Sequence, residues 1–151
     1  MKRRDALKIG AFGLAATAIP AVASSSYEGL NPYSKYRDKV INRNRYSMSE
    51  KPTKSELKHT PEIKIGSKDA KGYTLVEITI GQKGILHPSS DAHWIDFIEL
   101  KADGKLIDRV LFEPGKSMGY AAFKVKLDGV KSLTAVEGCN LHGIWEHTVK
   151  I

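Results

Sequence analysis

WIDFIELKADGKLIDRVLF, residues 94–112, indicates the architecture of this chain more clearly than any other segment. Residues 94–101 form a mostly apolar run that is rich in strand-forming side chains. The pair Asp103-Gly104 follows, and this dipeptide is a strong signal for a tight hairpin turn. The chain then returns through a second run, residues 106–112. The segment therefore predicts two antiparallel strands joined by a short turn.

The same alternation of short runs and turn signals continues through the C-terminal part of the chain. Residues 73–80 place Val76, Ile78 and Ile80 on one face of a strand and polar residues on the other. Further strands are expected at 62–65, 121–127, 132–137 and 144–151, with breaks at Gly66-Ser67, Lys71-Gly72, Pro114-Gly115 and Asp128-Gly129. About seven strands without a long helical period predict an all-β protein, an immunoglobulin-like β-sandwich.

Residues 1–23 have the composition of an export signal. A basic start precedes the apolar run 9–19, which is too short for an ordinary transmembrane helix. Ala21-Val22-Ala23 is a small-residue site that predicts cleavage before Ser24. The pair Arg3-Arg4 resembles a twin-arginine signal, with a Sec signal as the alternative. The sequence thus predicts an exported, periplasmic protein.

Residues 24–55 are rich in Ser, Tyr, Asn, Lys and Arg and show no sustained apolar period. We expect a linker or extended arm there, followed by one globular domain over 56–151. The formal net charge is +7, but the basic excess is concentrated in the export signal and the arm. Because the domain is left near neutral, its charge argues against a nucleic-acid-binding face.

The only cysteine of the chain, Cys139, lies three residues before His142. A thiolate and an imidazole at this separation can reach one metal ion from a tight turn, although the pair also fits a buried cysteine beside a surface histidine. Three further histidines, His59, His87 and His93, fall at loop-like positions outside the expected strands. A thiolate among several imidazoles favours a single transition-metal site.

The remaining histidine, His147, alternates with Trp145 and Val149 on the last expected strand. We therefore expect it to be half-buried or at the surface. A lone cysteine in an exported chain cannot form an internal disulfide, and binding a metal is one reason to retain it.

These motifs resemble the superoxide reductase family in its single-iron form, the neelaredoxins and the catalytic half of desulfoferrodoxin. The resemblance covers about residues 56–151, and its motifs are Lys58-His59-Thr60-Pro61, His87-Pro88, His93-Trp94-Ile95 and Cys139-Asn140-Leu141-His142-Gly143. It implies one mononuclear non-haem iron (Fe2+/Fe3+), with His59, His87, His93 and His142 as equatorial ligands and Cys139 as the axial ligand. The implied activity is one-electron reduction of superoxide to hydrogen peroxide at an open sixth position.

The resemblance also assigns roles to the residues around the iron. Lys58 matches a lysine beside the open position, which implies a catalytic role in attracting superoxide. Family members commonly carry a glutamate directly before this lysine as a ferric ligand. Here Leu57 occupies that place and Glu56 lies one residue earlier, so we expect water or hydroxide at the sixth position of the oxidised protein.

Hydrogen bonds to the sulfur tune centres of this kind. The backbone amides near Leu141 and His142 are the expected donors, and Asn140 is expected to shape the turn that carries them.

Two other functions stay open from the residues. A cupredoxin-like electron-transfer protein is also a β-sandwich, but blue copper sites usually have a methionine after the cysteine, and the last methionine here is Met118. A non-catalytic exported sandwich domain that binds a protein partner predicts no bound metal. For the reductase, the expected partners are superoxide, a rubredoxin-like or periplasmic electron donor, and further copies of the chain in a dimer or tetramer.

Overall fold

The strand pair predicted over residues 94–112 is present in the computed structural model, which describes residues 41–43 and 51–151. Strand β5 (Ile95–Ala102) pairs antiparallel with β6 (Lys105–Leu111). The connecting residues Asp103 and Gly104 have φ angles of 45° and 80°. Positive φ at both central positions is what a type I′ turn requires, so the Asp-Gly pair forms the expected turn.

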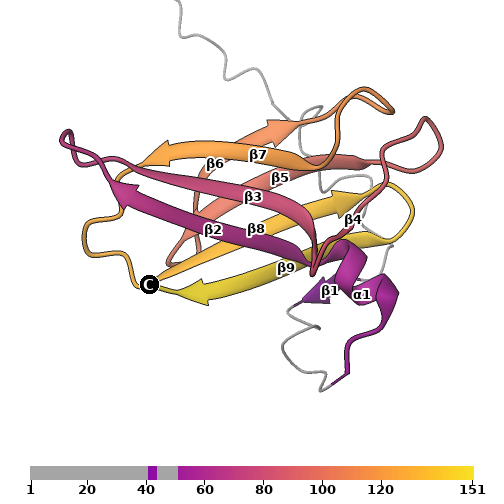
Figure 1. Ribbon diagram of the computed structural model, residues 1–151, viewed down its shortest axis with the longest axis horizontal. Coiled ribbons are helices and arrows are strands. Elements are labelled where there is room, and N and C mark those ends of the chain that lie inside the picture. Colours follow the sequence, from indigo (N-terminus) through magenta and orange to yellow (C-terminus); the bar gives the residue numbers. More distant parts are fainter. Residues whose placement is uncertain (1–40, 44–50) are drawn as a thin grey trace, which may run out of the picture. The chain divides into compact units, whose positions relative to one another are not determined.

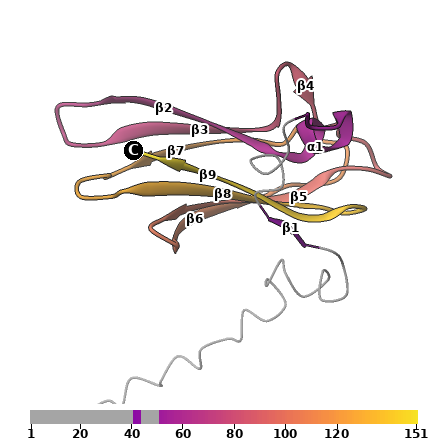
Figure 2. The ribbon, with the colours of Figure 1, turned by 90° about the horizontal axis from the view of Figure 1, so that it is seen from below.

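Two sheets pack face to face, as Figures 1 and 2 show. One sheet has the strand order β1-β9-β8-β5-β6, and the other has the order β2-β3-β4 with β7 paired to β3. The remaining strands are β1 (Ile41–Arg43), β2 (Pro61–Lys68), β3 (Thr74–Gln82), β4 (Ile85–Leu86), β7 (Tyr120–Val125), β8 (Ser132–Cys139) and β9 (Gly143–Lys150). Among the described pairs, only β1 and β9 run parallel. The prediction of an all-β sandwich is confirmed.

The interior of the sandwich is filled by alternate residues of both sheets. The three apolar residues predicted on one face of β3, Val76, Ile78 and Ile80, are at most 1% exposed. Leu133 and Ala135 of β8 meet this cluster from the opposite sheet and are fully buried. Burial of this many branched side chains is the main stabilising contribution to the fold.

Three short elements go beyond the predicted strands, namely β1, β4 and helix α1 (Lys54–His59). The helix begins with a capping box, in which the Thr53 hydroxyl accepts from the backbone N–H of Glu56. The Glu56 carboxylate in turn accepts from the backbone N–H of Thr53. The segment before the first histidine is therefore a helix, and the expectation of a loop there is wrong.

The strand break expected at Gly66-Ser67 is also wrong, because β2 continues through both residues to Lys68. The pairing register with β3 shifts between Ile65 and Lys68. A bulge of this kind bends a strand without ending it, and glycine tolerates the local geometry.

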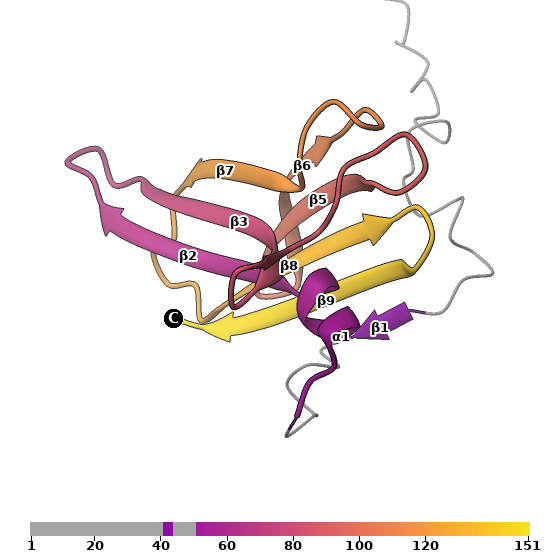
Figure 3. The ribbon, with the colours of Figure 1, turned by 45° about the vertical axis from the view of Figure 1, so that its right-hand side comes forward.

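One end of the sandwich collects the segments that carry the candidate ligands. Helix α1, the β4–β5 connection and the β8–β9 turn all lie at this end, on the right in Figure 1 and again in Figure 3. We call it the ligand end. The opposite end carries the β2–β3, β5–β6 and β7–β8 turns.

The predicted export signal and most of the predicted arm lie outside the described residues. All described residues belong to the compact unit that spans residues 31–151. Within 41–43 and 51–151, the structure contains no helix long and apolar enough to cross a membrane.

Candidate metal centre

Cys139 is the last residue of β8 and is fully buried. Burial is the largest effect on its thiol and raises the pKa to about 11. The backbone N–H groups of Leu141 and His142 donate to the sulfur and favour the thiolate. The turn ends at Gly143, whose φ of 81° is a conformation that side chains other than glycine rarely adopt. The sulfur therefore has the two amide donors expected from the sequence.

His59 ends α1 and is fully buried. Its Nδ1 lies 2.7 Å from the carbonyl oxygen of Ser55, and because a carbonyl can only accept, Nδ1–H is the donor. The lone pair of Nε2 is left facing the site, 3.0 Å from Nδ1 of His142. Burial is the largest cause that lowers the pKa of His59, to about 4, so the ring is neutral at pH 7.

His87 repeats this arrangement from the β4–β5 connection. Its Nδ1–H donates to the carbonyl oxygen of Pro88 at 2.7 Å. Its Nε2 is buried and has no hydrogen-bond partner among the described residues. Its ring centroid lies 4.9 Å from that of His59 and 4.5 Å from that of His93. A buried nitrogen that has no protein partner among the described residues and lies among other imidazoles is suited to bind a metal ion.

A close backbone contact brings His87 into this position. Gly81, at the end of β3, has a φ of 119°, and a Cβ atom there would lie 2.0 Å from the carbonyl oxygen of Ile85. Only glycine permits this contact, which turns the chain back toward α1 through β4. The backbone N–H of His87 then donates to the carbonyl of Ile80 at 3.0 Å.

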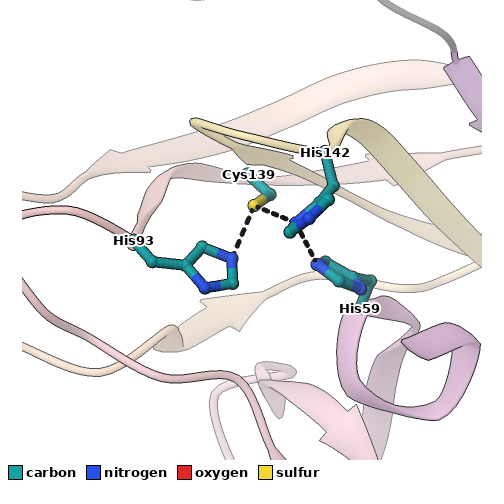
Figure 4. A group of neighbouring side chains, drawn as sticks. All are labelled: His59, His93, Cys139 and His142. Atoms are coloured by element: carbon teal, nitrogen blue, oxygen red, sulfur yellow. Dashed lines mark hydrogen bonds between the residues drawn. The ribbon is translucent and has the colours of Figure 1, made fainter. Parts of the chain in front are cut away.

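His93 and His142 complete the group from two different connections. Nε2 of His93 lies 3.3 Å from Sγ of Cys139, and Nδ1 of His142 lies 3.4 Å from the same sulfur. Figure 4 shows the two rings and His59 turned toward the sulfur. His142 is exposed and His93 is half-buried, so this side of the group is open to solvent.

The potential ligand atoms of His59, His93, Cys139 and His142 all lie within 4.8 Å of one another. Transition-metal bonds to nitrogen and sulfur are about 2.0–2.3 Å long, so opposite ligands of one ion stand about 4–4.6 Å apart. The described cluster therefore fits a single mononuclear iron site, which agrees with the predicted cofactor. His87 stands beside this cluster, in ring contact with two of its members.

Asn140 ties the two ligand loops together. Its side-chain oxygen accepts from the backbone N–H of Trp94 at 2.9 Å, and its amide nitrogen donates to the carbonyl of Ala92 at 3.0 Å. The segment around His93 is thereby fixed against the turn that carries Cys139. The sequence predicted only that Asn140 shapes its own turn.

Trp145 is a contributor that the sequence did not indicate. Its indole is stacked on the ring of His59, with centroids 4.9 Å apart and an angle of 14° between the planes. Trp145 lies on β9, close in sequence to His142 but far from His59. A contact between a strand and a distant helix leaves no local pattern in the sequence. The half-buried His147 on the same strand bonds to the carbonyl of Pro61 and lies outside the cluster, as expected.

Lys58 lies in the last turn of α1, beside His59. After burial, its positive charge is the next largest cause that lowers the pKa of His93. It also lowers the pKa of His59, His87 and Cys139, where other causes rank before it. Its charge therefore acts on four of the five candidate ligands.

Glu56 lies on the same face of α1 as His59 but its carboxylate is directed to the start of the helix. One carboxylate oxygen accepts from the backbone N–H of Thr53 at 2.8 Å and from the Thr53 hydroxyl at 2.9 Å. Side chains on a helix point toward its N-terminus, which explains the direction. Leu57, in the place of the family glutamate, has no atom that could bind a metal.

Comparison with known proteins gives a consistent result. Residues 51–148 match the family model described as desulfoferrodoxin. The chain is 42% identical over 89 residues to desulfoferrodoxin from Nitratidesulfovibrio vulgaris, which covers 59% of this chain and 60% of that protein. The chain thus spans less than two thirds of this relative's length.

Two shorter relatives are covered almost completely. Superoxide reductase from Pyrococcus abyssi is 33% identical over 103 residues, which covers 62% of this chain and 87% of that protein. The solved structure of superoxide reductase (neelaredoxin) from Ignicoccus hospitalis is 31% identical and superposes with a TM-score of 0.57, over 74% of this chain and 93% of that one.

Proposed function

Because this chain belongs to the desulfoferrodoxin family, we propose that it is a superoxide reductase that converts superoxide to hydrogen peroxide. One observation carries the proposal. A buried thiol with two amide donors meets imidazoles from separate segments, with their ligand atoms within 4.8 Å of one another. Iron bound there would supply the single electron, and two protons from solvent would complete the product.

The ligand set that we propose is His59, His87, His93, His142 and Cys139. His87 is included because its buried Nε2 has no partner among the described residues and its ring contacts two others of the set. The carbonyl groups that accept from Nδ1 of His59 and His87 hold both rings in the tautomer that presents Nε2. The amides that donate to Cys139 would moderate the charge of the thiolate.

Lys58 would attract the superoxide anion to the open side of the site. Lys58 directly precedes the buried ligand His59, and its charge acts on four of the five proposed ligands. A fixed cation near the reacting anion raises the encounter rate and stabilises developing negative charge.

Glu56 would not bind the oxidised iron. Its carboxylate is half of the capping box of α1, and moving it to the metal would remove hydrogen bonds from the helix start. We therefore propose water or hydroxide as the sixth ligand of the ferric protein, consistent with Leu57 in the family glutamate position.

The proposed domain organisation is an export signal over 1–23, an arm over 24–55 and the iron-binding sandwich over 56–151. The basic start, the Arg3-Arg4 pair and the short apolar run support export through a twin-arginine-like signal and a periplasmic location. The twin-arginine route carries folded proteins, which suits a metal site loaded before export. The electron donor would then be a rubredoxin-like or periplasmic carrier, and the chain would act as a dimer or tetramer.

Metal analysis and a superoxide pulse test the activity together. Protein purified under anaerobic conditions should contain one iron per chain, and the reduced protein mixed with superoxide should yield hydrogen peroxide without oxygen. Copper in place of iron would favour a cupredoxin-like electron carrier. The lack of any metal would favour a non-catalytic domain that binds a protein partner. Oxygen evolution would indicate dismutation and contradict the reductase.

The role of Lys58 has a matched control on the same helix. Lys58→Ala should slow the reaction with superoxide by roughly 10-fold and weaken its dependence on ionic strength. Lys54→Ala removes an exposed lysine at the other end of α1 and should leave the rate nearly unchanged. Equal effects of the two substitutions would show that Lys58 contributes only as one of the surface charges and has no specific role at the site.

A further inference from the structure

Strand β7 is an edge strand that lacks the usual protection of an edge. An unpaired edge exposes backbone donors and acceptors, and proteins usually interrupt it with a bulge or a proline. The edge strand β6 has a bulge at Ile107, which has no register partner on β5. The edge strand β2 begins with Pro61 and shifts its register after Ile65. By contrast, β7 pairs with β3 in one continuous register and contains no proline.

The backbone of β7 is paired on one side only among the described strands. The backbone N–H of Ile80 on β3 donates to the carbonyl of Gly119 at 2.8 Å. The backbone groups of an antiparallel strand alternate in direction, so the odd-numbered residues of β7 face β3. The side away from β3 therefore carries the N–H and C=O groups of Tyr120, Ala122 and Lys124. This side can accept a further strand.

Exposed apolar side chains gather along the same edge of the sandwich. Strands β6 and β7 both lie at the upper edge in Figure 1, and again in Figure 3. We call this the β6–β7 edge. It carries five of the eleven large apolar side chains that are exposed among the described residues, namely Leu106, Ile107, Leu111, Met118 and Tyr120. Their exposed fractions are 38–54%. Contiguous apolar exposure of this kind marks an interaction surface.

We propose that the β6–β7 edge binds a second copy of this chain, with β7 paired antiparallel to its equivalent. The proposal deepens the dimer or tetramer suggested above and rests on that part of the proposed function. A two-fold axis through Ala122 would place Ala122 opposite its equivalent and Tyr120 opposite Lys124 of the second copy. The sheet would then continue from β2 of one copy to β2 of the other, and the same apolar edge of both copies would meet.

The side chains of β7 complement one another in this arrangement. Lys124 of one copy would lie beside the ring of Tyr120 of the other, whose hydroxyl donates to Glu77. A cation beside an aromatic ring and a carboxylate is favourable, and the two-fold axis repeats the contact. The ammonium group has three donors, so it can keep its bond to Asp69 at 2.9 Å. Ala122 is exposed and small, which permits close approach at the axis.

Other registers of β7 against itself are less favourable. An axis through Ala121 or Phe123 would bring together residues whose backbone groups already face β3. An axis through Lys124 would place two lysines directly opposite, which is destabilising. An axis through Tyr120 would need its N–H, which already donates to the carbonyl of Met118 at 2.8 Å. The register centred on Ala122 avoids all three conflicts.

The second copy would also restrain a connection that carries candidate ligands. The carbonyl of Ser117, in the connection between β6 and β7, accepts from the hydroxyl of Ser89 at 2.6 Å. Ser89 lies between His87 and His93 in the chain. A partner packed against the neighbouring Met118 would therefore hold the β4–β5 connection indirectly.

Sedimentation of the full chain tests the interface. The unaltered chain should be a dimer or tetramer, and Ala122→Lys should halve its mass, because two added lysines would face each other across the axis. Ser67→Lys adds the same charge at an exposed position of β2, on the opposite edge of the same sheet, and should leave the mass unchanged. A monomeric unaltered chain, or an unchanged mass for Ala122→Lys, overturns the proposal. The measurement uses neither iron nor superoxide, so its failure is distinct from failure of the reductase.

A disulfide tests the register and covers the case in which Ala122→Lys does not fold. The two Ala122 Cα atoms would lie about 5.5 Å apart, within the range of a disulfide, so oxidised Ala122→Cys should form a covalent dimer. Tyr120→Cys should not, because its equivalents would lie about 13 Å apart along the strands. The native Cys139 is buried. No covalent dimer from Ala122→Cys, or an equal yield from Tyr120→Cys, overturns the proposal.

Discussion

The two ends of the sandwich fix their connections with different chemistry. At the end opposite the ligands, exposed carboxylates accept from nearby amides. Asp103 accepts from the backbone N–H groups of Lys131 and Ser132, and Asp69 accepts from those of Lys71 and Tyr73. At the ligand end, buried imidazoles donate Nδ1–H to carbonyl groups and leave lone pairs that nothing in the described protein satisfies fully.

The difference shows which end of the sandwich depends on a bound metal ion for its stability. Turns closed by carboxylates and amides satisfy their polar groups with protein atoms. The ligand end buries a thiol and several imidazoles, and burying polar groups without full hydrogen bonding costs stability. A bound metal would offset that cost, so substitutions of the candidate ligands and of the residues that hold them should alter metal binding, and substitutions at the opposite end should not.

The largest expected effect is that of Cys139→Ser. Loss of the thiolate should abolish the sulfur-to-iron charge-transfer band and the reaction with superoxide, because no other described residue places sulfur at the site. Absorption spectra of the oxidised protein, with iron analysis on the same sample, check this. A charge-transfer band that survives the substitution would show that the axial ligand is wrong.

Loss of a residue that hydrogen-bonds to a metal ligand typically weakens metal binding by about 10–100-fold. His87→Ala should weaken iron binding by more than this, because it removes a proposed ligand itself. Nε2 of His87 is buried beside the other imidazoles and lacks a partner among the described residues. Competition with a chelator measures the affinity. The control is His147→Ala, which removes a half-buried imidazole outside the cluster and should leave iron binding unchanged. Similar losses in both variants would exclude His87 as a ligand.

Acid should weaken the two ends over different pH ranges in the metal-free protein. Burial depresses the pKa of His59 to about 4 and that of His87 to about 3, from 6.5. The unfolded chain binds these protons first, so the free energy of unfolding decreases as pH falls below about 6.5. The carboxyls of Asp69 and Asp128 have pKa values below the usual 3.8, held down first by hydrogen bonds from Lys124 and Lys68, and lose their contribution only below that value.

Denaturant unfolding of the metal-free protein at a series of pH values checks this order. Replacing His59 and His87 with Gln should flatten the curve between pH 6.5 and about 3, because the folded-state pKa values of the two rings are about 4 and about 3. A free energy of unfolding that is constant down to pH 4 would contradict burial of neutral imidazoles.

Asn140→Ala and Asp103→Ala form a matched pair across the two ends. Both remove a side chain that holds two backbone segments together. Asn140→Ala should weaken iron binding by roughly 10-fold, because the loop of His93 loses its tie to the turn of Cys139. Asp103→Ala should lower the melting temperature without changing iron affinity. Equal iron affinity of the two variants would contradict the proposed role of Asn140 in holding the His93 loop.

The smallest effect is expected at Glu56. Glu56→Ala removes one half of the capping box and should lower the free energy of unfolding by about 1 kcal/mol, with no change in the spectrum of the oxidised protein. Glu56→Gln can still accept from Thr53 and should retain most of the stability. A spectrum that changes with Glu56→Ala would make the carboxylate an iron ligand.

The features that the sequence predicted well are those with a local signal. The Asp103-Gly104 turn and the alternation of Val76, Ile78 and Ile80 depend on neighbouring residues, and both appear where expected. Helix α1 was missed because its signal is the Thr53 and Glu56 pair on a six-residue element, too short for a helical period. A two-residue strand such as β4 carries no period at all.

The features that escaped prediction depend on distant pairs. The bonds of Asn140 to the loop before β5 and the stacking of Trp145 on His59 join segments that no spacing rule connects. The burial of Val136 on β8 is similar, since Val136 alternates correctly with the core residues and yet is buried. Only the register of three strands shows that Phe97 and Ile144, the partners of Gly138, share its face.

The burial of His59 and His87 determines the proton stoichiometry of metal uptake, because it outweighs their Nδ1 hydrogen bonds to carbonyl groups, which by themselves raise the pKa. At pH 7 both rings are already neutral, with pKa values of about 4 and 3, whereas the thiol of Cys139, with a pKa of about 11, still carries its proton. Loading the site at neutral pH would therefore release a proton from the sulfur and none from these two rings. Calorimetric titrations in buffers with different ionisation enthalpies would count it.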